Sequence, residues 1–149
     1  MTDKLSSGAV PSTLYTEHYF LGVCEGYQEF LSSEGAYLSQ RLTEALAVAG
    51  IAPGMAVLDV GCGRGEILRH TTRLGARAFG IDYAAVAVRL SQNIAADEAK
   101  EGRSVGVYQA SALYLPFEAN TFDRVLMLDI VEHLYPAELD VALAEARRV

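Results

Sequence analysis

The stretch that most constrains the fold is VLDVGCGRGE at residues 57–66, where an apolar run ends near an acid and opens into a glycine-rich loop. A continuous apolar run of this kind is typical of a strand that is covered on both faces. Glycine at every second position permits tight turning and a close approach of the backbone to a ligand. One glycine would fit a plain strand-to-helix turn, but three alternating glycines after Asp59 favour a binding loop.

The remainder of the chain alternates between strand patterns and helix patterns. We expect strands at about 55–60, 76–82, 104–110 and 122–129, and helices at about 66–74, 84–100 and 136–149. Strands that alternate with helices imply parallel pairing with right-handed crossovers. The predicted fold class is therefore α/β, a Rossmann-like doubly wound parallel sheet with helices on both faces and an N-terminal helical extension.

Three segments are expected along the chain: a flexible tail at 1–13, an N-terminal helical segment at 14–50, and the sheet domain at 51–149. Within the helical segment, leucines four residues apart mark one apolar helix face. We expect Ser32 or Ser33 to cap this helix and Gly50 to close it.

The charge and cysteine content exclude several classes of protein. The formal net charge is −7 and the basic residues are scattered, which argues against a nucleic-acid partner. The chain has no apolar run of the length that a membrane span needs and no signal-peptide pattern at its N-terminus. Cys24 and Cys62 form neither a metal-binding spacing nor a disulfide framework. We predict a cytoplasmic protein with no metal site, no nucleic-acid partner and no membrane span.

The glycine spacing narrows the ligand class. A dinucleotide loop has glycine at its first, third and sixth positions, but here Gly61 and Gly63 are followed by Glu66 at the sixth. A carboxylate at the start of a helix repels a pyrophosphate, so a nucleoside without phosphates fits better than NAD or FAD. Asp82, at the end of the second strand, has the spacing of an acid that accepts ribose hydroxyls. Capping of the helix that begins near Ala84 explains Asp82 equally well, and the two roles are compatible.

Three ordered motifs carry a family resemblance. VLDVGCGRGEIL, GIDYAAVAVRLSQ and LPFEANTFDRVLMLDIVEHL are similar to the class I S-adenosylmethionine-dependent methyltransferases, in the subgroup that includes ubiquinone and menaquinone biosynthesis enzymes. The resemblance covers residues 50–149, and YFLGVCEGYQEFLSSEG resembles the leaders of some bacterial members. It implies S-adenosylmethionine as the cofactor and a small molecule as the methyl acceptor.

The resemblance also implies where the methionine part of the cofactor lies. Asp59 would bind its ammonium group, directly or through water. The loop residues Gly61, Cys62, Gly63 and Gly65 would surround it with backbone.

For the nucleoside part, the resemblance assigns the ribose hydroxyls to Asp82 and the neighbourhood of the adenine to Tyr83. Ser111 stands where the family usually has an aspartate that reads the adenine amino group, and a hydroxyl accepts that bond more weakly than a carboxylate. Ala112 would contribute a backbone N–H, and Asp129 would lie beside the bound cofactor.

The candidates for acceptor chemistry follow the fourth strand. His133 and Glu132 are candidate general bases, which are needed only when the acceptor proton has a high pKa. Glu132 facing solvent and His133 holding the turn before the last helix is the competing interpretation. Tyr15 and Tyr19 are candidates for a lid over the site, or for packing an N-terminal helix onto the domain.

Four strands are expected here, whereas the family fold that the motifs resemble has seven. We therefore expect the fourth strand to be an uncovered apolar edge, which pairs with a second copy as a homodimer or is covered within a longer native protein. The leading function is methyl transfer to a small molecule. A cofactor-binding module without turnover is the second candidate, and a nucleotide-dependent oxidoreductase, disfavoured by Glu66, is the third.

Overall fold

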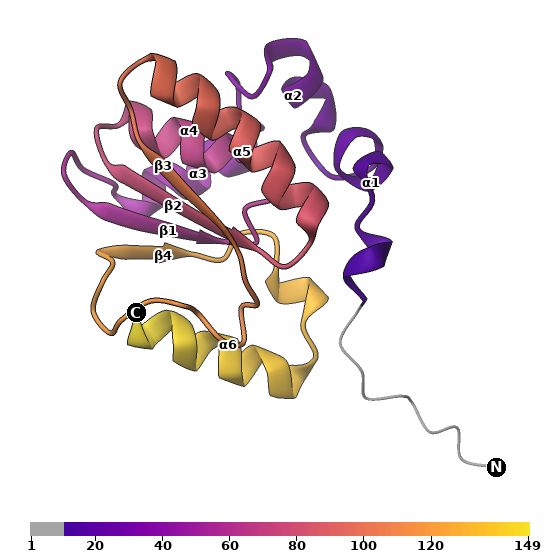
Figure 1. The fold of residues 1–149 in the computed structure, drawn as a ribbon, viewed down its shortest axis with the longest axis vertical. Coiled ribbons are helices and arrows are strands. Elements are labelled where there is room, and N and C mark those ends of the chain that lie inside the picture. Colours follow the sequence, from indigo (N-terminus) through magenta and orange to yellow (C-terminus); the bar gives the residue numbers. More distant parts are fainter. Residues whose placement is uncertain (1–10) are drawn as a thin grey trace.

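The computed structural model describes residues 11–149, which form one parallel sheet covered by helices on both faces (Figure 1). The sheet order is β3-β2-β1-β4 and every pair is parallel. The predicted α/β fold class, a parallel sheet with helices on both faces, is thus confirmed. The tail expected at 1–13 lies, apart from its last three residues, outside the described residues.

The N-terminal segment contains three short helices after a 3₁₀ turn at Ser12–Leu14. They are α1 (Glu17–Gly22), α2 (Tyr27–Ser33) and α3 (Gln40–Ala49). The expected cap of α3 was wrong. Ser32 and Ser33 belong to the end of α2, which stops there because Glu34 and Gly35 have left-handed backbone. The cap of α3 is instead Ser39, whose hydroxyl accepts the N–H of Leu42 at 3.4 Å. The predicted closure at Gly50 is confirmed, since Gly50 adopts the left-handed conformation at the C-cap.

The four strands are β1 (Ala56–Val60), β2 (Arg77–Asp82), β3 (Val105–Gln109) and β4 (Arg124–Leu126). Helices α4 (Glu66–Arg73) and α5 (Ala85–Lys100) make the crossovers, and α6 (Pro136–Arg148) follows a 3₁₀ turn at Val131–His133. The fourth strand is shorter than expected. Before it, the Phe122 N–H donates to the Val149 carbonyl at 2.9 Å instead of joining the sheet, and after it the chain turns toward α6.

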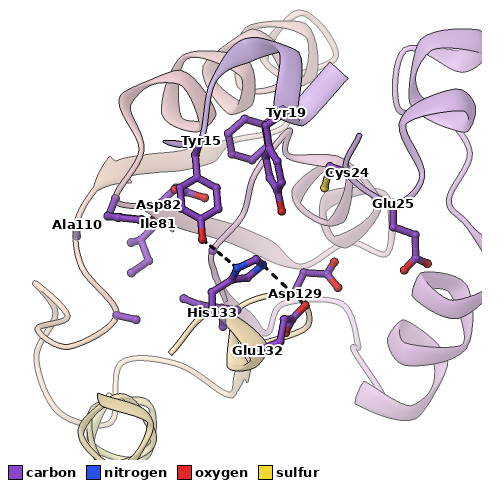
Figure 2. A pocket seen from close by; sticks show the side chains of 15 residues that line it. Tyr15, Tyr19, Cys24, Glu25, Ile81, Asp82, Ala110, Asp129, Glu132 and His133 are labelled. Atoms are coloured by element: carbon purple, nitrogen blue, oxygen red, sulfur yellow. Dashed lines mark hydrogen bonds and ion pairs between the residues drawn. The ribbon is translucent and has the colours of Figure 1, made fainter. Parts of the chain in front are cut away.

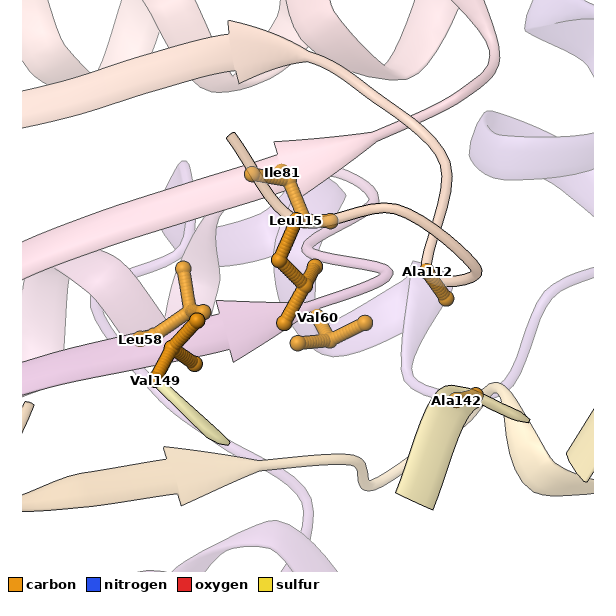
Figure 3. Close-up of a cluster of buried hydrophobic side chains, with 7 residues drawn as sticks. All are labelled: Leu58, Val60, Ile81, Ala112, Leu115, Ala142 and Val149. Carbon is orange, nitrogen blue, oxygen red and sulfur yellow. The ribbon is translucent and has the colours of Figure 1, made fainter. Parts of the chain in front are cut away.

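Both faces of the sheet carry apolar cores, which is why every residue of β1 is buried. On one face, helices α3 and α4 pack against Val57 and Leu126. On the other face, Leu58 and Val60 pack with side chains from the loop after β3, from α6 and from its C-cap residue Val149 (Figure 3). The central strand is thereby fixed, and the loop that follows it starts from a rigid base.

The far side of β4 is an edge. Within residues 11–149 no strand pairs with it there, and a shallow groove between β4 and α6 contains Phe122, Val125 and Leu143. This agrees with the expected open edge but identifies no partner. No helix in the described part of the chain is both long enough and apolar enough to cross a membrane.

Candidate functional site

A cavity opens at the carboxyl ends of the strands, which is where doubly wound sheets bind their ligands (Figure 2). Each strand delivers residues to it: Gly61 follows β1, Asp82 and Tyr83 lie at the end of β2, Ala112 follows β3, and Asp129 follows β4. The N-terminal segment forms the opposite wall, with side chains of Tyr15, Tyr19, Phe20, Cys24 and Glu25. Segments far apart in sequence therefore enclose one space.

The glycine loop is tied to β2 at the base of the cavity. The N–H groups of Gly61 and Cys62 both donate to the carbonyl of Ile81, at 2.8 and 2.9 Å. Gly61 lines the cavity directly, and Cys62 lines a smaller extension of it. The buried Cys62 thiol is 3.4 Å from the Ser91 hydroxyl on α5. The loop is thus tied both to β2 and to α5.

The other two glycines of the loop have different positions. Gly63 donates its N–H to Asp82 Oδ2 at 3.1 Å and lies under the ring of Phe20. Gly65 has φ +88°, and a Cβ built there would lie 3.1 Å from Ser91, so only glycine lets α4 begin this close to α5. Neither Gly63 nor Gly65 lines the cavity, and both act by shaping the loop.

Asp82 connects the loop to the start of α5. Its Oδ1 accepts the N–H of Ala84 at 2.9 Å, while Oδ2 accepts the N–H of Gly63. The side chain is buried, which raises the pKa of its carboxyl group, and it also lines the cavity. The carboxylate has about four lone-pair sites and interacts with three backbone N–H groups, those of Ala84, Gly63 and Tyr83, so a site remains for a ligand hydroxyl and the two roles of Asp82 are compatible.

Asp59 is the unusual group of the site. It is 4% exposed, and burial raises the pKa of its carboxyl group to about 8, with the carboxylates of Asp129, Asp82 and Glu66 adding to the shift. No hydrogen bond or ion pair from residues 11–149 reaches its side chain. It lines the inner extension of the cavity, which shares Gly61 and Asp129 with the main space. A buried carboxyl group among carboxylates, with no partner of its own, fits a ligand that brings a positive charge.

The region expected to surround a nucleobase is formed in part. Tyr83 lines the cavity with its ring centroid 5.5 Å from that of Tyr15, and burial raises the pKa of the Tyr83 hydroxyl. Ala112 lines the same space. Ser111 does not, because it is exposed and its hydroxyl accepts the N–H of Leu113 at 3.2 Å.

At the mouth of the cavity, the two lid candidates meet the two candidate bases (Figure 2). The Tyr15 hydroxyl lies 2.9 Å from His133 Nδ1, and His133 Nε2 lies 4.0 Å from a Glu132 carboxylate oxygen. Burial raises the pKa of Tyr19 to about 12, with smaller contributions from neighbouring groups that include Glu132. The structure therefore brings together the four residues expected at the acceptor end.

Sequence reasoning missed several residues of the N-terminal wall. Arg41 on α3 donates to Glu25 at 3.0 Å and to Asp129 at 2.6 Å, and so connects the wall to the end of β4. Arg41 and Asp129 are 88 positions apart, and no local pattern marks the pair. Among the residues that the structure describes, no group of three or more histidine, cysteine or acidic side chains is placed to hold a metal ion.

Comparison with known proteins agrees with this geometry. Residues 58–149 match the family model described as a methyltransferase domain. The chain is 34% identical over 116 residues to a ubiquinone biosynthesis O-methyltransferase of Methylocella silvestris, covering 72% of this chain and 43% of that protein. It is 37% identical over 120 residues to an erythromycin 3''-O-methyltransferase of Saccharopolyspora erythraea, covering 79% of this chain and 37% of the relative. The chain thus spans about two fifths of the length of these curated relatives.

Solved structures give the same fold. The crystal structure of magnesium protoporphyrin IX methyltransferase from Synechocystis PCC 6803 with bound S-adenosylmethionine superposes with a TM-score of 0.64 at 20% identity. That match covers 95% of this chain and 73% of the other. The chain therefore belongs to the class I S-adenosylmethionine-dependent methyltransferases.

Proposed function

We propose that this chain binds S-adenosylmethionine in the cavity at the carboxyl ends of β1 and β2, and that the protein transfers a methyl group to a small-molecule acceptor. The observation that carries the proposal is Asp59, a buried carboxyl group without a partner among residues 11–149, which lines the inner extension of the cavity whose main space Asp82 lines. One ligand with an amine at one end and a ribose toward the other meets both acids. Family membership and a structural homologue with bound S-adenosylmethionine support the same ligand.

Each part of the ligand has a residue suited to hold it. Asp59 is the acceptor for the ammonium group, and Asp82 the acceptor for the ribose hydroxyls. Tyr83 and Ala112 provide the surface for the adenine, and the backbone of Gly61 lies between the two acids. When bound, S-adenosylmethionine supplies an electrophilic methyl group on a sulfonium. The task of the protein is then to hold the acceptor in line with that methyl and to keep water out.

His133 is our candidate for the general base. A lone pair on Nε2 requires the proton to sit on Nδ1, and Nδ1–H then donates to the Tyr15 hydroxyl 2.9 Å away. In that tautomer Nε2 can take a proton from an acceptor, and the nearby Glu132 carboxylate stabilises the imidazolium that results. Tyr15 thus orients the base from the lid.

The acceptor itself is a small hydroxyl or amine compound in this proposal. The mouth of the cavity is formed by tyrosines, His133 and the carboxylates of Glu25 and Glu132, and no lysine or arginine among the described residues lines it. An acceptor with a phosphate or carboxylate near its reactive group would be repelled by these acids. Phenols, alcohols and amines without negative charge fit better.

Isothermal titration calorimetry tests the binding half of the proposal. We expect one molecule of S-adenosylhomocysteine to bind per chain and NAD to give no heat, with circular dichroism as a check that the chain is folded. A folded chain that does not bind S-adenosylhomocysteine, or that binds NAD instead, would overturn the proposal.

Turnover is tested by a separate measurement. The chain spans only 43% and 37% of two curated relatives, so binding of the cofactor does not by itself imply catalysis. Catalysis is assayed as transfer of a tritiated methyl group to a library of phenols, alcohols and amines. Transfer that falls in His133→Asn while cofactor affinity stays unchanged supports the base. Binding without transfer to any library member would favour the cofactor-binding module.

A further inference from the structure

Arg64, in the middle of the glycine loop, is a buried cation that the methyl-transfer chemistry does not use. Its side chain is only 3% exposed. Its Nε and Nη2 atoms donate to the two carboxylate oxygens of Glu66, at 3.0 and 2.8 Å, in a two-pronged pair. A buried pair of this kind is maintained only when the remaining donors are also satisfied.

Those remaining donors point to the N-terminal segment. Arg64 Nη1 donates to the carbonyl of Phe20 at 2.9 Å, and Nη2 donates to the carbonyl of Glu25 at 2.7 Å. Phe20 lies in the last turn of α1, where carbonyls lack a donor within the helix. The guanidinium also lies 5.2 Å from the ring centroid of Phe30 on α2. One arginine therefore contacts α1, the loop after it, and α2.

The segment that Arg64 holds is also the wall of the cavity. Phe20, Cys24 and Glu25 line the cavity from this side, and Gly61, three residues before Arg64, lines it from the glycine loop. Glycine at position 26 leaves room for this contact, because Gly26 has φ +75° and a Cβ there would lie 3.3 Å from Arg64 Nη2. Loop and wall thus meet through one side chain.

We propose that Arg64, paired with Glu66, is a positioning residue that locks the N-terminal wall onto the glycine loop and couples closure of the wall to ligand binding in the loop. The anchor rests on contacts within the chain, whereas the identity of the ligand rests on the proposed function. Coupling of this kind is reciprocal. A ligand that orders the loop stabilises the closed wall, and a loosened wall lowers the affinity for the ligand by the same factor.

Hydrogen exchange of the ligand-free chain tests the anchor alone. We expect Arg64→Met to speed exchange of amides in α1 and α2 by tenfold or more, on the order of the coupling between linked sites, while β1 and β2 amides keep their protection. In Arg64→Lys the exchange rates of these amides should lie between those of the wild type and Arg64→Met, because one ammonium group cannot make all the hydrogen bonds of a guanidinium. Arg89→Met is the matched control, since Arg89 holds α1 through an exposed ion pair with Glu17 at 3.0 Å. It should change exchange little.

Unchanged exchange in α1 and α2 of Arg64→Met, or equal acceleration in the sheet, would overturn the anchor. If Arg64→Met does not fold, Arg64→Lys and Glu66→Gln decide the matter by the same comparison of helix and sheet amides. An effect of Arg89→Met equal to that of Arg64→Met would also contradict the proposal.

Calorimetry with S-adenosylhomocysteine tests the coupling. The ligand should increase protection of α1 and α2 in the wild type, and Arg64→Met should bind it about tenfold more weakly, within the range usual for linked sites. Equal affinity in a variant whose wall has loosened would overturn the coupling while leaving the cofactor assignment intact. No binding by the folded wild type would overturn the cofactor assignment, and the exchange data would still decide the anchor.

Discussion

Asp59 gives the sharpest prediction, because its ionisation should be linked to ligand binding. Burial and three nearby carboxylates raise the pKa of the Asp59 carboxyl group to about 8. At pH 7 about nine tenths of the ligand-free molecules therefore carry a proton on Asp59. An ammonium group binds the carboxylate and not the neutral acid, so binding at neutral pH should release that proton.

The magnitude follows from one charged hydrogen bond. If the carboxylate holds the ammonium about 2.7 kcal/mol better than a neutral group does, a value at the upper end for charged hydrogen bonds, binding gains about a hundredfold. The pKa of Asp59 in the complex then falls by about two, to about 6. Binding should release about 0.8 proton at pH 7, about 0.5 at pH 8 and about 0.1 at pH 9.

The assay is calorimetry in pairs of buffers with different ionisation enthalpies, carried out on the wild type and on Asp59→Asn. The free ligand is the same in both titrations, so the difference between the two proteins isolates Asp59. The two affinities should agree within about twofold at pH 6 and differ by about fiftyfold at pH 8. An affinity gap that does not change with pH, or equal proton release by both proteins, would refute the proposed role of Asp59.

Three further predictions concern stability, the second acid and the sheet edge. Because the folded pKa of Asp59 lies above its value of 3.8 in the unfolded chain, the ligand-free protein should lose stability as pH rises from 4 to 8, and Asp59→Asn should flatten that fall in thermal melts. Asp82→Ala should weaken S-adenosylhomocysteine binding by roughly 1.5–3 kcal/mol per lost charged bond, and an unchanged affinity in calorimetry would remove Asp82 from the site. If the open edge of β4 pairs with a second copy, light scattering should find a dimer that Val125→Lys dissociates, whereas a wild-type monomer at high concentration would contradict the pairing.

The sheet was predictable because its rules are local. Apolar runs, glycine stops and the strand–helix alternation predicted four parallel strands joined by helical crossovers, and the structure has both. The lengths were less predictable. The apolar pattern runs on past Leu126, but β4 ends there because the following residues turn toward α6 and contribute Asp129 to the cavity.

The candidate site was predictable where the residues follow strands directly. Asp59, Gly61, Asp82 and Asp129 sit at the strand ends that the pattern marked, and all border the cavity or its inner extension. The wall opposite them was not predictable in detail. The contact of Tyr15 with His133 joins positions 118 apart, and no periodicity carries that information.

The sequence argument from Glu66 was incomplete. From sequence, its carboxylate at the start of α4 was expected to repel a pyrophosphate. In the structure the side chain is buried and pairs with Arg64, two positions earlier, so much of its charge is compensated. The preference for a ligand without phosphates therefore rests more on Asp59 itself and on the nearby carboxylates of Asp129 and Asp82.

A crystal structure of the chain with S-adenosylhomocysteine tests the central claim most directly, because one ligand should meet both buried acids. We expect its amino group within hydrogen-bonding distance of Asp59, its ribose hydroxyls against Asp82, and its adenine beside Tyr83. A complex in which the ligand binds elsewhere, and no ligand amine lies near Asp59, would contradict the assignment of this cavity.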